Sequence, residues 1–179
     1  MMRAMTRRRT GFSLTELILM IVILGILAAM AIPQLSRGAT VSSAEQLDHD
    51  LALLRIAIEM YFDQHGEYPG ARDAGEGFGG AGTPEAFAQQ LTMFSAQDGR
   101  VSRQPSETFC FGPYLKDGIP ACCVADGTRP RCVWLCTDED APGFQPDAAD
   151  YGWVFNYRTG YIAANSDRLD EHGARFDTH

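Results

Sequence analysis

The hydrophobic pattern divides the chain into an unbroken apolar run, an amphipathic stretch and a mixed remainder. From residue 17 to residue 32 the sequence has no charged or polar side chain. An apolar run of this length without charge is typical of a membrane-spanning helix. Four arginines precede the run within residues 1–11. This basic leader predicts that the N-terminus stays cytoplasmic while the rest of the chain crosses the membrane.

One carboxylate, that of Glu16, lies at the edge of the apolar run. Ten Leu, Ile or Val residues between positions 17 and 32 each favour insertion by ~0.3–0.6 kcal/mol, whereas an acid at mid-membrane costs about 2.5–3.5 kcal/mol. Insertion is therefore favoured overall, but the carboxylate still needs a cation. Cleavage between Gly11 and Phe12 would supply one, the new α-amino group of Phe12.

Residues 11–17, Gly-Phe-Ser-Leu-Thr-Glu-Leu, follow the basic leader and resemble the processing site of the type IV pilin and type II secretion pseudopilin family. The resemblance implies that a prepilin peptidase cuts after Gly11 and methylates Phe12. It also implies that Glu16 pairs with the amino terminus of a neighbouring subunit during assembly. Pro33 falls where the family places a helix-kinking proline, and it is expected to bend or locally melt the helix.

An ordinary secretory signal peptide is the alternative interpretation of the same run. Ala29-Met30-Ala31 resembles the small-residue site at which such peptides are cleaved. Cleavage there would release a soluble domain, but it would leave Glu16 and the Gly11–Phe12 junction without a role.

Helical periodicity returns after residue 43. An apolar stripe recurs at spacings of three and four, formed by Leu47, Leu51, Leu54, Ile58 and Phe62 (or Tyr61). Charged side chains are expected on the opposite face: Glu45, Asp48, Asp50, Arg55, Glu59 and Asp63. Gly66 and Pro69 predict the end of one long helix that begins at Phe12, with His65 as a turn residue.

The remainder predicts a short helix and a hairpin. Thr83-Pro84-Glu85 has the chemistry of a helix start, and Gly99 is expected to close that helix, which presents Phe87, Leu91 and Phe94. Residues 151–157 and 161–165 predict a β-hairpin that turns at Gly160, with Trp153, Phe155 and Tyr157 on one face. The tail from residue 167 to 179 is polar and expected to fray, with His172 and His179 in solvent.

These elements predict an α+β fold in which a long N-terminal helix packs against a C-terminal antiparallel β-sheet of about three or four strands. The family resemblance implies the lollipop shape of pilins. The expected organisation is a leader at 1–11, a transmembrane and filament-core helix at 12–33, the amphipathic half of that helix at 34–66, and a periplasmic globular domain at 67–179.

All five cysteines lie in one region of the expected domain: Cys110, Cys122, Cys123, Cys132 and Cys136. Disulfide stapling of an exported domain is one interpretation, with the connectivity left open. Four thiolates holding a soft metal is another, but the spacing matches no usual paired Cys-x2-Cys motif. An odd count also permits one bridge between subunits.

An acidic, turn-rich segment follows the cysteines. Its carboxylates are hard oxygen ligands of the kind that bind calcium: Asp138, Asp140, Asp147 and Asp150. Major secretion pseudopilins have a calcium site in a late loop, so the resemblance implies Ca2+ here. A solvated acidic loop is the alternative.

Charge and motif content exclude other classes. The net charge is −8, and the chain without its leader has 11 basic and 23 acidic residues, or −12, which argues against nucleic-acid binding. The sequence presents no serine–histidine–acid trio, paired histidines or nucleotide-binding loop, so no enzymatic activity is expected.

The resemblance implies a structural subunit of a type II secretion pseudopilus, most similar to the major, G-type subunit, first held in the inner membrane and then assembled into a filament. Its expected partners are further copies of itself, minor pseudopilins, prepilin peptidase, the inner-membrane assembly platform and membrane lipid. A type IV pilus pilin is the alternative within the family. A membrane-tethered periplasmic metal or thiol-redox module that never polymerises is the alternative of another class.

Overall fold

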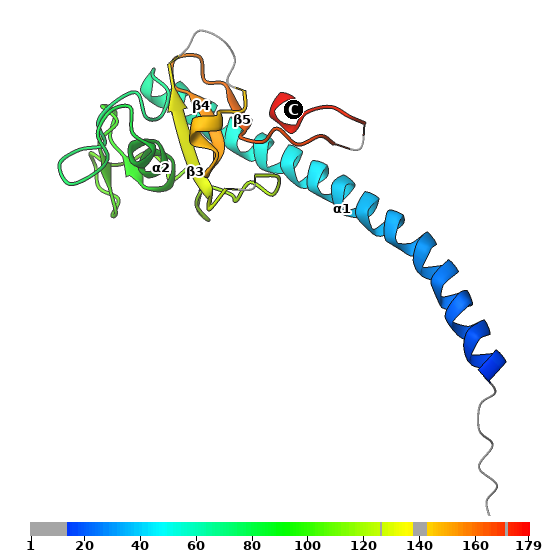
Figure 1. Cartoon of the computed structure of the whole chain (residues 1–179). Helices are drawn as coiled ribbons and strands as arrows, with labels where there is room; N and C mark the ends of the chain where they lie inside the picture. Colours follow the sequence, from blue (N-terminus) through cyan, green and yellow to red (C-terminus); the bar gives the residue numbers. More distant parts are fainter. Residues whose placement is uncertain (1–13, 126, 138–142, 171) are drawn as a thin grey trace, which may run out of the picture. The chain divides into compact units, whose positions relative to one another are not determined.

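In the part of the chain that the structure describes, the fold combines two α-helices and two short 3-10 helices with two small β-sheets (Figure 1). A computed structural model describes residues 14–125, 127–137, 143–170 and 172–179, and for residues 27–42 it describes the backbone alone. The chain separates into two compact units, residues 1–39 and 40–179. The predicted α+β class is confirmed, whereas the four predicted segment boundaries stay predictions.

Helix α1 runs from Leu14 to His65; the predicted start at Phe12 lies outside the described residues. Gly66 ends it in a left-handed conformation with φ 75°, and its amide donates to the carbonyl of Phe62 at 2.7 Å. This is the glycine termination that the sequence predicts. The backbone is helical without interruption at Pro33, so the structure shows no local melting there.

The predicted apolar stripe of α1 is buried in the domain core. Leu47, Leu51, Leu54 and Ile58 have at most 1% of their surface exposed, and Tyr61 continues the stripe. Phe62 is only half-buried and stacks on Tyr68 at 4.4 Å between ring centroids.

Asp50, by contrast, was expected on the solvent face and is buried instead, with 6% of its surface exposed. It lies three positions after Leu47, on the same side of the helix. Its Oδ1 accepts a hydrogen bond from Nε2 of Gln46 at 3.0 Å. This bond gives one of the two oxygens of the buried carboxylate a donor.

The main sheet has three strands in the order β3–β4–β5: β3 Arg129–Cys136, β4 Tyr151–Asn156 and β5 Ile162–Ala164. Strands β4 and β5 are antiparallel, as predicted, whereas β3 is parallel to β4, so the expected antiparallel sheet is in fact mixed. A parallel pair needs a crossover of a dozen or more residues. The connection at 137–150 is long enough to return the chain to the other end of the sheet.

The β4–β5 turn depends on Asn156 and Gly160. The side-chain oxygen of Asn156 accepts the amides of Arg158 and Thr159, and its carbonyl accepts the amide of Gly160 at 2.8 Å. Gly160 has φ 76°, and a Cβ at this position would overlap the ring of Tyr68. Both constraints favour glycine, and the predicted hairpin is confirmed.

Aromatic side chains of β4 join the sheet to both helices. Trp153 and Phe155 are fully buried in the same cluster as the α1 stripe. Phe155 packs against Phe87 of α2 (Pro84–Thr92) at 4.7 Å between ring centroids. The indole nitrogen of Trp153 donates to the carbonyl of Pro120 at 2.9 Å, so its polar atom is satisfied as well.

Helix α2 begins as predicted but ends earlier. Thr83 caps it by accepting the amide of Ala86. The expected end at Gly99 is wrong, because the carbonyl of Leu91 accepts the amides of Tyr114 and Leu115 instead of continuing the helix.

The chain then forms a two-stranded sheet that includes Phe94, a residue expected on the helix. Its strands are β1 (Phe94–Ser95) and β2 (Val101–Ser102), which pair antiparallel.

Replacement of Leu54 by alanine should lower the free energy of unfolding by about 2–5 kcal/mol, because it leaves a cavity in the core. Its neighbour Leu53 is 43% exposed, so Leu53→Ala is the matched control and should change stability by less than about 1 kcal/mol. Denaturant unfolding of the full chain in detergent, followed by the fluorescence of Trp134 and Trp153, measures both. Equal losses of unfolding free energy in the two variants would contradict the burial of Leu54 in the apolar stripe.

Candidate assembly interface

The residues of the predicted processing site are only partly described by the structure. Gly11 and Phe12 lie outside the described residues. Glu16 lies in the first turn of α1 and is exposed. A carboxylate in the first turn is favoured by the partial positive charge at a helix N-terminus.

The start of α1 exposes apolar side chains on every side. Every residue from Leu14 to Ile26 is exposed, and the large apolar residues among them keep 49–75% of their surface accessible. A helix that is apolar all round requires lipid or other protein around it, and an exposed apolar surface of this size marks an interaction site. Glu16 is the single ionisable side chain in this segment.

Within the described residues, no helix combines the length and the apolar character that crossing a membrane requires. The membrane-spanning assignment of residues 12–33 stays a prediction, as does the expected inner-membrane location.

The other end of α1 contains a buried histidine, His65, which the sequence predicts only as a turn residue. His65 is the last residue of α1, and its Nε2 lies 3.1 Å from the hydroxyls of both Tyr114 and Ser95. Its Nδ1 lies 3.4 Å from the carbonyl of Gln97, and its ring stacks on Tyr61. Burial lowers the pKa of His65, so the neutral ring is favoured. This residue therefore stabilises the fold at neutral pH and less so as the pH falls.

The cysteines occupy different environments in the structure. Cys110, Cys122, Cys123 and Cys132 are free thiols. Burial raises the pKa of the Cys122 thiol to about 11. A thiol that stays protonated at neutral pH is a poor metal ligand and a poor nucleophile.

Two of the cysteines donate to backbone carbonyls. The Sγ of Cys123 donates to the carbonyl of Ser43 on α1 at 3.3 Å, and the Sγ of Cys136 donates to the carbonyl of Phe155 at 3.6 Å. The structure supports no particular disulfide pairing, so the pairing stays a prediction.

The predicted calcium ligands are divided between described and undescribed residues. Asp138 and Asp140 lie outside the described residues. Asp147 is exposed in the short 3-10 helix η1 (Pro146–Ala148). Asp150 is exposed too, and its Oδ1 accepts a hydrogen bond from the hydroxyl of Thr128 at 3.2 Å. In the described part of the chain, no three His, Cys, Asp or Glu side chains are grouped closely enough to share a metal ion. Calcium binding stays a prediction.

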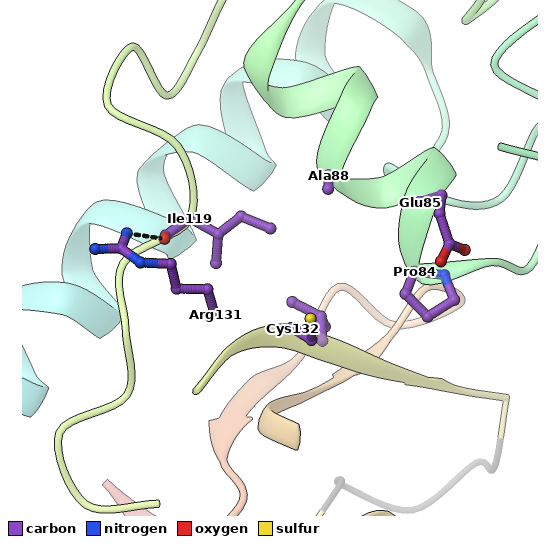
Figure 2. A pocket seen from close by; sticks show the side chains of 7 residues that line it. Pro84, Glu85, Ala88, Ile119, Arg131 and Cys132 are labelled. Atoms are coloured by element: carbon purple, nitrogen blue, oxygen red, sulfur yellow. Dashed lines mark hydrogen bonds between the residues drawn. The ribbon is translucent and has the colours of Figure 1, made fainter. Parts of the chain in front are cut away.

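Two cavities lie beside β3. The smaller, about 140 Å3, lies between α2 and β3, and Figure 2 shows Arg131 turned away from Glu85 and toward the carbonyl of Ile119, which it contacts at 2.9 Å. This volume is below the usual size of a ligand pocket.

The larger cavity, about 450 Å3, is lined by Leu53 of α1, residues 114–118, Pro120 and Arg131. Among the described residues that line it there is no histidine, serine or cysteine. Neither cavity brings together the groups that nucleophilic catalysis requires.

The chain is similar to proteins named type II secretion system core protein G. It is 36% identical to that of Aeromonas hydrophila over 63 residues, which cover 35% of this chain and 44% of the relative. It is 28% identical to the Klebsiella pneumoniae protein over 101 residues (56% of this chain, 69% of the relative). It is also 28% identical to the Escherichia coli K12 protein over 106 residues (59% and 70%).

The chain thus spans less than half of the Aeromonas relative and about two thirds of the other two. No protein-family profile matches the chain, and no solved structure does. The resemblance to type II secretion pseudopilins, and among them to the G-type subunit, is confirmed by these matches.

Calcium should stabilise the domain if the acidic loop binds it, because a ligand that binds only the folded state adds about 2.7 kcal/mol at a concentration of 100 times its Kd. We expect Ca2+ to raise the Tm of the wild-type chain, and we expect the rise to be lost in an Asp147→Asn/Asp150→Asn double variant. Differential scanning calorimetry with and without Ca2+ measures this. Glu107→Gln, an exposed acid outside the loop, is the control. No rise in the wild-type chain would contradict the prediction.

Proposed function

Because the chain is a relative of the type II secretion pseudopilins, we propose that it is a structural subunit of a secretion pseudopilus. Prepilin peptidase cuts it after Gly11 and methylates Phe12. The trimmed subunit is held in the inner membrane, with residues 67–179 in the periplasm. It then joins further copies of itself and minor pseudopilins through the assembly platform.

One structural observation supports this proposal above the others, the exposed start of α1. Residues 14–26 are apolar apart from Thr15, Glu16 and Gly25, and all of them are exposed. Such a surface is costly in water. Lipid before assembly and the same segments of neighbouring copies after assembly would each remove it from water.

Glu16 gives the assembled form a specific register. Inside a filament core its carboxylate would be desolvated, and a buried charge without a partner costs several kcal/mol. The α-amino group that cleavage creates at Phe12 is the cation that the proposal assigns to it. Pairing between neighbouring copies neutralises both groups and penalises any stacking that separates them.

The comparisons favour a secretion subunit over a type IV pilus pilin, because the matched relatives are named for the secretion system. A thiol or metal module is less favoured, since the buried Cys122 thiol stays protonated at neutral pH.

Replacement of Gly11 by leucine should leave the leader attached, because the peptidase site requires a small residue before the cut. Intact-mass spectrometry of the membrane fraction should then find a chain that begins at Met1. Ala4→Leu, a change of the same kind within the leader, should be processed normally. A wild-type mature mass in the Gly11 variant would contradict the assigned cleavage site.

Replacement of Glu16 by alanine should leave membrane insertion intact and abolish filaments, because the neighbouring amino group loses its counter-ion. Leaving the amino group unpaired in the filament core should cost about 3–5 kcal/mol of assembly free energy per contact, and this cost is repeated at every subunit. Electron microscopy of sheared fibres and membrane fractionation measure the two properties separately. Glu45→Ala removes an exposed acid farther along α1 and should still assemble. Normal fibres from the Glu16 variant would rule out the assigned pairing.

A further inference from the structure

The C-terminal segment (residues 168–170 and 172–179) is packed against α1, contrary to the expectation that it frays. Phe176, in the short 3-10 helix η2 (Phe176–Thr178), is 1% exposed and belongs to the same core cluster as the α1 stripe. The guanidinium of Arg55 on α1 donates to the carbonyl of His179 at 2.8 Å. Figure 1 shows this segment, in red, beside α1. The side chain of His179 is thereby held against the domain, with 18% of its surface exposed.

The two ring nitrogens of His179 have different surroundings. Its Nδ1 lies 3.1 Å from Oδ1 of Asp48 on α1. A carboxylate only accepts hydrogen bonds, so Nδ1 carries a proton in this contact, and Nε2 of the neutral ring then has a lone pair. Nε2 is buried, and within the described part of the chain it has no hydrogen-bond partner. This atom therefore needs an acceptor for its electron pair.

The carboxylate of Asp170 faces the same nitrogen. Its Oδ2 lies 3.5 Å from Nε2 of His179, and only 8% of the Asp170 side chain is exposed. The other oxygen, Oδ1, accepts the amides of His172 and Ala174, each at 2.8 Å. The backbone thus fixes the carboxylate with Oδ2 toward the ring. A nitrogen lone pair and a carboxylate oxygen face each other, and a metal ion that accepts an electron pair from each would satisfy both.

The distance between these two atoms fits a tetrahedral ion. Zinc binds histidine nitrogen at about 2.0–2.1 Å and carboxylate oxygen at about 2.0–2.2 Å, which places two ligand atoms of a tetrahedral site about 3.3–3.5 Å apart. The separation of Nε2 and Oδ2 is 3.5 Å, longer than the usual N–H···O hydrogen bond of about 2.7–3.2 Å. We propose that Nε2 of His179 and Oδ2 of Asp170 bind a divalent transition-metal ion such as Zn2+, with water in the remaining coordination positions.

Asp48 has the place of a supporting group in this site. A histidine that binds a metal usually donates its other ring N–H to a carboxylate, which fixes the tautomer and the orientation of the ring. The contact between Nδ1 of His179 and Asp48 has this form. An ion bound by Asp170 and His179 would join two distant points of the C-terminal segment, and Asp48 would attach that segment to α1.

The donor set distinguishes this site from the predicted calcium loop. Calcium and magnesium prefer oxygen ligands alone, whereas an imidazole nitrogen suits zinc. The site has two protein ligands, which agrees with the finding that no three such side chains are grouped around one ion in the described residues. Because water completes the coordination, we expect weaker binding than in a closed structural zinc site. The site does not depend on the proposed assembly function.

Titration of the full chain in detergent with Zn2+, measured by isothermal titration calorimetry at neutral pH, tests the proposal. We expect His179→Asn to lower the zinc affinity by about tenfold or more, because asparagine keeps a donor for Asp48 and has no counterpart of Nε2. Asp170→Asn should lower it as well. His49→Asn, at an exposed position beside Asp48, is the matched control and should bind zinc as the wild-type chain does. An unchanged affinity in either ligand variant would overturn the proposal.

The free cysteines are alternative zinc ligands, so the ligand atoms must be identified directly. X-ray absorption at the zinc edge, with one equivalent of Zn2+, separates nitrogen and oxygen ligands at about 2.0–2.1 Å from sulfur at about 2.3 Å. We expect nitrogen and oxygen ligands with an imidazole contribution that disappears in His179→Asn. Sulfur ligation, or no zinc binding by the wild-type chain, would overturn the proposal even if neither ligand variant folds.

Discussion

The structure depends on one constraint: α1 has two apolar surfaces, and each must be removed from water in a different way. From Leu47 to Tyr61 the apolar residues form one stripe, which the sheet and α2 cover within the same chain. From Leu14 to Ile26 they surround the helix and remain exposed. The first surface folds the domain, and the second requires a partner or a lipid environment. A single helix thus combines a folding element with a proposed assembly element.

The domain core is closed by a few aromatic side chains. Trp153 and Phe155 of β4 lie on the α1 stripe, and Phe87 brings α2 onto the same cluster. The one polar side-chain atom among these three residues, the indole nitrogen of Trp153, donates to the carbonyl of Pro120. Because the core is complete without the first turns of α1, those turns are available for the proposed contacts between subunits.

Local patterns in the sequence were sufficient for the elements whose determinants lie close together in the chain. The stripe from Leu47 to Ile58 follows from spacing alone, and the hairpin at Gly160 follows from its turn chemistry. The burial of Asp50 was missed because it depends on what packs against its side of the helix. The parallel direction of β3 was missed because a strand pattern carries no information on the direction of its partner.

The packing of the C-terminal segment (residues 168–170 and 172–179) escaped prediction for a related reason. The expectation that this segment frays, with His179 in solvent, is wrong, because Phe176 is 1% exposed and His179 is partly buried. The segment's polar composition favours solvent, and its buried apolar residue, Phe176, gives no periodic signal. The charges that hold it come from Asp48 and Arg55, more than a hundred residues earlier in the chain. The candidate assembly site was predicted from the contiguous motif from Gly11 to Leu17, of which the structure describes only residues 14–17. The structure adds the exposure of Glu16 and its apolar neighbours.

The central claim, that the amino group of Phe12 and the carboxylate of Glu16 meet between copies, can be measured in assembled material. Filaments would be grown from a mixture of 15N-labelled and 13C-labelled chains and studied by solid-state NMR. The account predicts an intermolecular dipolar contact between the Phe12 nitrogen and the Glu16 carboxyl carbon at about 4 Å, the range of an ion pair. Well-ordered mixed filaments in which this contact is absent would contradict it.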